Sequence, residues 1–261
     1  MKPLHKILSA HCKKLNKIIV LMSTGSDEEL VHEFRVQFKK IRAIVRLTGN
    51  LKTPPSLKEL YTAAGKVREL QLLKNQLFNI QSVDQLPQFY AFIDNQISIT
   101  INTLKNKAAN GYEKEIETLL NNAKEHLTTK QVQKFIDKKT AALDHKAHGA
   151  NKADSTIHDA RKIIKDLIYS FHTLEEMELE KFYLSSAEKE FLHTISIELG
   201  IFQDWCTILS YLSLTKLRSL PEAEKQALKK IRVNFLRTKR EAKAIIIHQL
   251  NELSLIPIKT S

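Results

Sequence analysis

The sequence has few residues that interrupt regular structure or that support covalent and metal chemistry. Its 261 residues include only six glycines and six prolines, so long stretches contain no helix breaker. The two cysteines, Cys12 and Cys206, are too few for a disulfide framework, and a reducing cytoplasm is the simplest setting. Apolar runs are short, which argues against a membrane-spanning segment. The N-terminal apolar residues follow helical spacing and do not form the unbroken core of a signal peptide.

Motifs of common enzymes are also missing. The chain has no glycine-rich phosphate loop, no cysteine pair at zinc spacing and no serine nucleophile elbow. Asp144, His145 and His148 have a metal-like spacing, but no fourth ligand is near them in the sequence. We therefore predict no metal site, no cofactor and no enzymatic activity.

The sequence is instead rich in positive charge and in helix-forming residues. It has 41 Lys and Arg against 29 Asp and Glu, a formal net charge of +12, and 43% hydrophobic residues. Leu, Ile, Lys, Ala, Glu and Gln dominate, which favours helix over sheet. This positive excess suggests a polyanionic partner such as nucleic acid, an anionic membrane surface or a phosphate polymer. A merely basic protein has the same net charge, so the arrangement of the charges has to decide.

Hydrophobic periodicity and breakers predict an all-α fold. Residues 53–56 (TPPS) and 149–155 (GANKADS) are firm breaks between helical segments. Asn110 and Gly111 can break or kink a longer segment. The predicted helices span residues 3–22, 27–49, 56–82, 86–125, 129–147, 154–176, 184–214 and 220–252.

One pattern occurs twice in the chain. The spacing His-x-x-Arg-x-x-x-Lys and the apolar positions around it are the same in both copies. The matching residues are His32, Arg35 and Lys39 in the first copy and His158, Arg161 and Lys165 in the second. The repeat predicts two copies of a four-helix unit, at about residues 1–127 and 128–261, within a single domain.

The cations of the first copy form a row along one side of their helix. At about 100° per residue they fall within an arc of about 80°, beside the apolar stripe and not opposite it. They are His32, Arg35, Lys39, Arg42 and Arg46. Such crowding is costly, because like charges repel and partial burial strengthens the repulsion. We predict that the row faces a cleft and binds a polyanion; the alternative is a boundary row with heads in water.

Two further rows extend this prediction. The second copy has Ile168 and His172 in place of the cations Arg42 and Arg46, so its row is weaker. The last helix carries cations within an arc of about 100°, again beside apolar residues. The candidate binding residues are His32, Arg35, Lys39, Arg42, Arg46, His158, Arg161, Lys165, Arg232, Lys239, Arg240 and Lys243, with Arg68, Lys229 and His172 as weaker candidates.

Glycines and aromatics outside the rows have simpler interpretations. Gly65 and Gly200 each cost a helix about 1 kcal/mol, and we predict that they allow close helix packing. The aromatic residues, Phe202 and Trp205 among them, follow core spacing. We predict that they pack in the core and do not stack on bases.

The two copies of the repeat resemble the signature helix of the CHAD domain, the conserved histidine α-helical domain. The first copy has H-x-x-R-x-x-x-K-K-x-R from His32 to Arg42. The second copy matches at His158, Arg161, Lys165 and Tyr169 and departs from the family pattern at Ile168 and Asp166. The L-G-x-x-x-D pattern that ends at Asp204 is similar to a later helix of the family. The resemblance covers nearly the whole chain.

The resemblance implies two four-helix bundles related by a pseudo-twofold axis, with a basic central cavity. It also implies binding of inorganic polyphosphate, since members of that family bind this polymer and localise to polyphosphate granules. We therefore expect a non-catalytic, cytoplasmic polyphosphate-binding module without a membrane partner. A polyanion beside His32 or His158 would raise the histidine pKa, so binding should tighten toward pH 6.

Two alternatives from other classes stay open. A nucleic-acid-binding helical protein would use the same charge, usually with exposed aromatics or a protruding recognition helix. An enzyme that processes phosphoanhydrides would need a metal-binding acid cluster or an activated nucleophile. Glu69 and Asp204 are the candidate acids for that chemistry.

Overall fold

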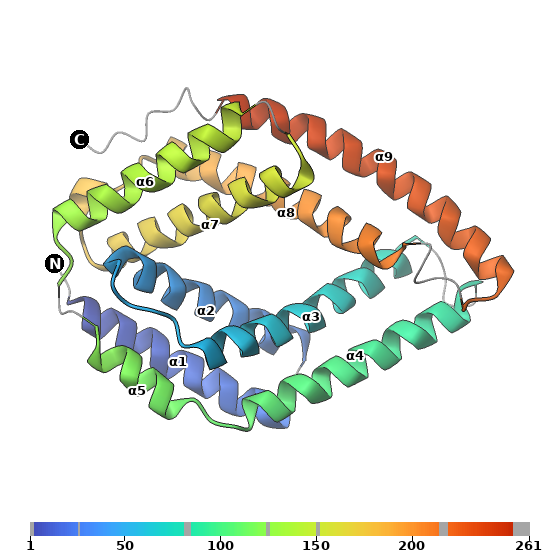
Figure 1. Cartoon of the computed structure of the whole chain (residues 1–261), viewed down its shortest axis with the longest axis horizontal. Helices are drawn as coiled ribbons and strands as arrows, with labels where there is room; N and C mark the ends of the chain where they lie inside the picture. Colours follow the sequence, from blue (N-terminus) through green and yellow to red (C-terminus); the bar gives the residue numbers. More distant parts are fainter. Residues whose placement is uncertain are drawn as a thin grey trace.

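The computed structural model of the chain describes residues 3–25, 27–80, 85–123, 126–149, 152–213 and 219–252. These residues form α-helices and a short 3-10 helix without a β-strand, which confirms the predicted all-α class (Figure 1). The elements are α1 (Leu4–Thr24), α2 (Glu28–Thr48), α3 (Pro55–Phe78), α4 (Pro87–Ala108), α5 (Glu113–Asn121), α6 (Thr129–His148), α7 (Asp154–Glu176), η2 (Glu180–Phe182), α8 (Ser186–Tyr211) and α9 (Glu222–Glu252). No described helix has the length and hydropathy that crossing a lipid bilayer requires.

The helix boundaries follow the sequence closely except in one segment. Residues 86–125, predicted as one helix, form α4 and α5 with a break between them. Gly111 lies in this break with a φ of +70°, which glycine accepts without strain. Tyr112 is 3% exposed, and its hydroxyl donates to the Lys107 carbonyl at 3.1 Å, which anchors the turn. Residues 81, 82, 124, 125 and 214 of the predicted helices lie outside the described residues.

Local sequence determines where α2, which carries the first cation row, begins and ends. The Asp27 carboxylate accepts a hydrogen bond from the Leu30 amide at 2.7 Å and caps the N-terminus. Glu28 and Glu29 occupy the first turn, where the helix dipole favours acids. Gly49, with a φ of +73°, ends the helix in the left-handed conformation.

The helices of the two halves pack in the same order. In the first half α1 contacts α2, α2 contacts α3, α3 contacts α4, and α4 returns to α1. In the second half α6, α7, α8 and α9 repeat this order, while α5 packs on α1. A duplicated four-helix unit would have this packing order; the pseudo-twofold relation itself stays a prediction.

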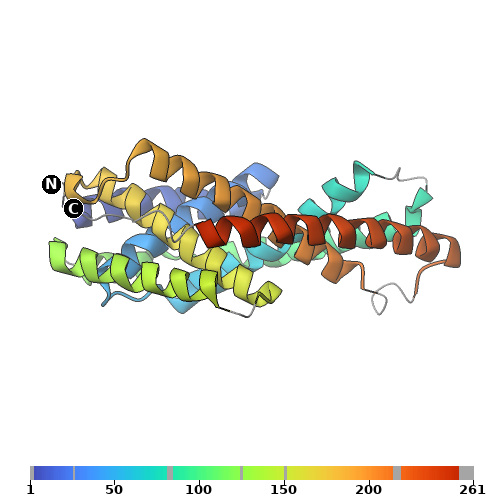
Figure 2. The same ribbon diagram turned by 90° about the horizontal axis from the view of Figure 1, so that it is seen from above.

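The halves meet through their inner helices. Helix α2 packs against α7 and α3 packs against α8, with α1 and α4 along one side and α6 and α9 along the other (Figure 1). Seen from above, α3, α4, α8 and α9 extend beyond the other helices at one end of the molecule (Figure 2). The candidate cation rows of α2 and α7 therefore lie on neighbouring helices.

Apolar packing joins the halves as well. The larger hydrophobic cluster contains buried residues of α1 and α2 together with residues of α6 and α7. A smaller cluster combines the C-terminal parts of α3 and α8 with the N-terminal parts of α4 and α9. In that region Glu224 of α9, 5% exposed, accepts hydrogen bonds from the Gln88 and Phe89 amides at 3.1 and 2.9 Å. This carboxylate satisfies free amides at the start of α4, so a polar contact also connects the halves.

Candidate functional site

Cations from α2 and α7 converge around one lysine between the two halves. The pKa of Lys39 is lowered from 10.5 to about 7, first by burial and then by the charges of Arg35, Arg161, Lys165 and Arg42. Two of these charges lie on α7, so the rows act on each other across the interface between the halves. We call these five residues the central cation cluster.

Helix α3 contacts two arginines of α2, Arg35 and Arg42, through a carbonyl and an aromatic ring. Arg35 Nη1 donates to the Tyr61 carbonyl at 3.2 Å, and Arg35 Cζ is 4.5 Å from the centroid of the Tyr61 ring. Arg42 Cζ lies 5.6 Å from the same ring, which also stacks on Phe38 with centroids 4.5 Å apart. The aromatic ring therefore binds two guanidinium groups through its negative face.

Gly65 gives the Arg35 guanidinium the room it occupies. A Cβ added at Gly65 would lie 2.7 Å from Arg35 Nη1. The glycine thus makes space for a cation side chain and not for a close crossing of two helix backbones, which corrects our prediction. At Gly200 a Cβ would meet no atom of the described residues within 4 Å, so the packing role that we predicted for Gly200 is wrong.

The arginine of α7 has a different environment. Arg161 Nε is buried and has no hydrogen-bond partner among the described residues. Burial lowers the pKa of Arg161, as does the charge of Arg35, whereas Asp204 of α8 acts in the opposite direction. Burial in turn raises the pKa of Asp204, against the charges of Arg161 and Arg68. Arg161 therefore keeps unused donor capacity beside a half-buried acid.

The remaining members of the cluster are also half-buried. Burial lowers the pKa of Lys165, with Arg161 contributing, and burial lowers the pKa of Arg42. Burial also raises the pKa of the Tyr169 hydroxyl, which lies close enough for Tyr61 and the cluster arginines to affect it. Within the described part of the chain, no ion pair joins a carboxylate to any of the five cations. The cluster thus combines repulsion with partial desolvation.

The histidines of the repeat do not share one environment. His32 is exposed, whereas His158 is half-buried and its Nδ1 makes a short hydrogen bond with Gln203 Oε1. Burial lowers the pKa of His158, and Lys162 and Arg161 contribute, while Gln203 opposes the shift. The neutral imidazole is therefore favoured before any anion binds. The rise in pKa that we expect with a bound polyanion stays a prediction.

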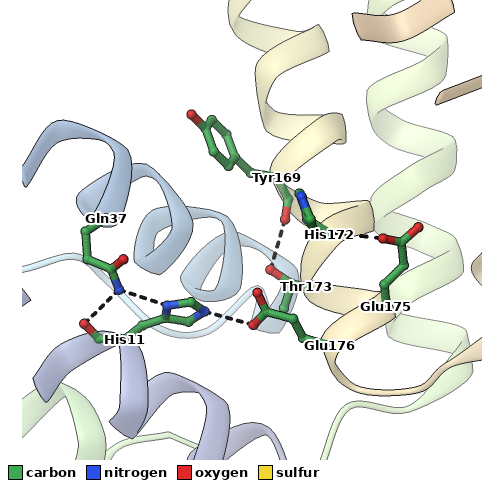
Figure 3. Close-up of polar contacts among 7 residues, drawn as sticks. All are labelled: His11, Gln37, Tyr169, His172, Thr173, Glu175 and Glu176. Carbon is green, nitrogen blue, oxygen red and sulfur yellow. Dashed lines mark hydrogen bonds and ion pairs between the residues drawn. The ribbon is translucent and has the colours of Figure 1, made fainter. Parts of the chain in front are cut away.

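His172 lies near the C-terminal end of α7 and is exposed. Its Nδ1 is 3.8 Å from Glu175 Oε2 (Figure 3). Nearby, His11 Nε2 lies 2.9 Å from Glu176 Oε2, and the Gln37 amide donates to the His11 carbonyl at 2.9 Å. This second group of contacts ties α1, α2 and α7 together (Figure 3). The described contacts of His172 are thus with the end of its own helix.

Among the described residues, Arg46 is the cation of its row that pairs with an acid. Its guanidinium donates to Asp166 Oδ1, and Lys139 of α6 donates to Asp166 Oδ2 at 2.7 Å. The Asp166 side chain is only 7% exposed. Arg46 nevertheless lies close enough to Arg42 to lower its pKa. The cation row of α2 therefore ends in an ion-pair network.

Some cations of α9 pair with an acid, whereas others are exposed to solvent. Lys239 and Lys243 both donate to Asp154 at the start of α7, Lys243 at 2.9 Å. Lys239 Nζ also lies 5.7 Å from the Phe202 ring centroid. Lys229 and Arg240 are exposed, and Arg232 is half-buried, with no described residue accepting a hydrogen bond from its Nε. The described partners of the two paired lysines belong to α7 and α8 outside the central cation cluster.

Two other sequence candidates also have partners. Arg68 of α3 donates to Glu28 in the first turn of α2. His148 Nδ1 lies 3.0 Å from Asp144 Oδ1, one helical turn away. Among the described residues no three His, Cys, Asp or Glu side chains form a group that could hold a metal ion.

Sequence reasoning did not identify the residues that position the cations or pair with them. Tyr61 was grouped with core aromatics, yet it lies one helical turn before Gly65, and that spacing was an available signal. Asp166 was noted only as a departure from the family pattern, and Lys139 was not singled out. The partners of Asp166 lie on α2 and α6, far away in sequence, so only the tertiary structure shows the network.

Comparisons with known proteins agree with this architecture. The CHAD domain family profile matches residues 6–213. The crystal structure of the CHAD domain from the plant Ricinus communis is similar, with a TM-score of 0.74, 17% identity and coverage of 95% of this chain and 90% of that chain. PptA from Streptomyces chartreusis has a TM-score of 0.63, 13% identity and coverage of 95% and 97%. No curated protein matches in sequence. The structural likeness shows the fold, and because the profile covers most of its length, the chain belongs to the CHAD domain family.

Proposed function

We propose that this CHAD domain binds inorganic polyphosphate, without catalysis, at the central cation cluster. The observation that carries the proposal is the convergence of four other cations on Lys39, from both halves of the chain. Crowded, partly buried like charges destabilise the free protein, and a bound polyanion relieves that repulsion. Charge-assisted hydrogen bonds to phosphate oxygens are strong, and guanidinium groups match their geometry.

The side chains around the cluster suit a polymer without bases. Polyphosphate is flexible and offers only charged oxygens, so donors and positive charge are sufficient to bind it. The Tyr61 ring already contacts Arg35, Arg42 and Phe38, which leaves it poorly placed to stack on a base. This environment supports polyphosphate over single-stranded nucleic acid, for which stacking on free aromatics contributes much of the affinity.

In the proposed complex, the members of the cluster have different roles. Arg35 is already positioned by α3, and Arg161 offers an unpartnered Nε. Lys39 gains a proton as the anion binds, because negative charge beside the amine raises its pKa. His158 lies one turn before Arg161 and adds a second titrating group at the edge of the site. We leave Arg46 out of this binding set because its guanidinium already pairs with Asp166.

A direct competition experiment tests the proposal. Labelled long-chain polyphosphate is titrated with the purified protein, and unlabelled polyphosphate or mixed-sequence DNA competes at fixed salt. We expect polyphosphate to compete far better than DNA. By analogy with single-stranded nucleic acid, each phosphate contact should add about −0.7 to the slope of log affinity against log salt concentration. Equal or better competition by DNA would favour the nucleic-acid alternative.

Incubation with polyphosphate and magnesium tests the absence of catalysis. We expect no release of phosphate; release that Asp204→Ala abolishes would support a phosphoanhydride-processing enzyme. The predicted location at polyphosphate granules in the cytoplasm also follows from this proposal. Imaging of the tagged chain, with and without polyphosphate in the cell, checks it.

A further inference from the structure

The central cation cluster is bounded by an acid where the α2 row ends. Arg42 and Arg46 are one helical turn apart on α2, and they differ in their partners. Arg42 has no ion-pair partner among the described residues, whereas Arg46 donates to Asp166. Lys165 and Asp166 are neighbours on α7, so the sign of the charge changes within one residue of the facing helix.

Asp166 holds cations from two other helices. Each of its carboxylate oxygens accepts from one of them: Oδ1 from Arg46 of α2 and Oδ2 from Lys139 of α6, the latter at 2.7 Å. The Asp166 side chain is 7% exposed, whereas those of Arg46 and Lys139 are 39% and 22% exposed. A ligand can thus reach the two cations, but both already donate to one carboxylate that solvent hardly reaches, which offsets one of their two positive charges.

We propose that Asp166 limits the length of polyanion that the site engages, by holding Arg46 and Lys139 in ion pairs at its end. This inference rests on the proposed polyphosphate binding. A chain that fills the central cation cluster reaches Asp166 next, where the carboxylate offsets one of the two positive charges and already accepts hydrogen bonds from both cations. Phosphates beyond that point therefore add little affinity, so Asp166 determines specificity for chain length without binding the ligand.

Binding of polyphosphates of graded length tests this role. Asp166→Asn should leave affinity for short chains, which end within the cluster, unchanged. Affinity for long chains should rise about tenfold, because one freed cation adds roughly one charge-assisted hydrogen bond. For long chains, the slope of log affinity against log salt concentration should become steeper by about 0.7 to 1.4, which corresponds to one or two new phosphate contacts.

Arg46→Gln provides the matched control. In the wild-type background it should change affinity less than twofold at any chain length, and in Asp166→Asn it should cancel the gain for long chains. The measurement of Arg46→Gln in the wild-type background does not depend on the folding of Asp166→Asn, which circular dichroism checks. Weakened long-chain binding by Arg46→Gln alone would overturn the inference, as would an Asp166→Asn variant that folds and binds all lengths like wild type. If wild type binds no polyphosphate, the proposed function itself fails.

Discussion

The two cation rows share a sequence pattern but differ in what supports them. On α2, Arg35 is fixed by a carbonyl and a ring of α3, with Gly65 leaving room for its guanidinium. On α7, no described residue accepts a hydrogen bond from the buried Arg161 Nε, and a Cβ added at Gly200 of α8 would meet no described atom within 4 Å. One side of the proposed site is therefore already held by neighbouring groups, while the other keeps an Nε donor that we propose a ligand would use.

The difference shows how two copies of one sequence pattern can have different roles in ligand binding. A pre-arranged side loses little conformational freedom on binding, which favours affinity. A less constrained side can adjust to a flexible chain that presents no fixed shape. The comparison leads to four tests. They neutralise an arginine, remove the Lys39 proton, remove the Tyr61 ring and add a methyl group at each of two glycines.

Neutralising an arginine on either side should have the largest effect. Arg35→Gln and Arg161→Gln should each weaken polyphosphate binding by about 10- to 150-fold, because each removes charge-assisted hydrogen bonds. Calorimetry at low salt measures both constants. Lys162→Gln is the control, since Lys162 is exposed and pairs with Asp159. If both arginine variants fold and bind like wild type, the site lies elsewhere.

Changing pH tests the protonation of Lys39, which lies between the two cation rows. The pKa of Lys39 is about 7 in the folded free protein and about 10.5 when unfolded, so the unfolded chain binds more protons between these values. Stability should therefore rise with pH above 7. Polyphosphate affinity should fall over the same range by up to about tenfold per pH unit, because binding takes up a proton.

Lys39→Met isolates this contribution. It should raise the thermal stability of the free protein at pH 7 and flatten the pH dependence of binding above pH 7. Binding titrations and thermal melts at matched ionic strength from pH 6.5 to 9 measure both effects. A variant that keeps the wild-type pH dependence would show that another group takes up the proton.

Removing the Tyr61 ring tests pre-arrangement on the α2 side. Tyr61→Leu should weaken binding by about 3- to 30-fold, because contacts of two guanidinium groups with the ring are lost. Tyr61→Phe keeps the ring and should bind like wild type. Equal losses in the two variants would assign the effect to the hydroxyl and contradict the proposed role of the ring.

Substitutions at Gly65 and Gly200 should have the smallest effects on binding, and they form the most closely matched pair of variants. Gly65→Ala should move the Arg35 guanidinium and weaken binding several-fold, with little cost to folding because the end of a flexible side chain can shift. Gly200→Ala should leave binding unchanged and stabilise the helix by up to about 1 kcal/mol. Binding titrations and chemical denaturation of both variants measure these effects. Identical effects of the two substitutions would contradict the asymmetry.

Sequence periodicity was sufficient to predict most helices and to single out the five residues of the central cation cluster. Helix α7 was predicted at residues 154–176, as observed, because a linker precedes it and its apolar spacing is regular. The wheel also identified Arg35, Lys39, Arg161 and Lys165 correctly as edging the apolar stripe, since that angle is a local property. The break at Gly111 was only an alternative, because the buried Tyr112 that fixes it depends on tertiary packing.

The environment of each cation could not be predicted in the same way. A wheel gives the direction of a side chain but not the group that faces it. Arg46 and Lys239 lie in rows that look alike in sequence, yet each meets an acid from a distant segment, Asp166 and Asp154. Whether a basic row is free or paired is thus decided by non-local contacts.

The most direct test of a shared site is the stoichiometry of binding. Calorimetric titration with a short polyphosphate of defined length should give one class of site and one chain per protein. Arg35→Gln and Arg161→Gln should each weaken that single event, because both rows bind the same molecule. Two independent events, each lost with only one of the substitutions, would show that the rows of α2 and α7 bind separately and would contradict the account.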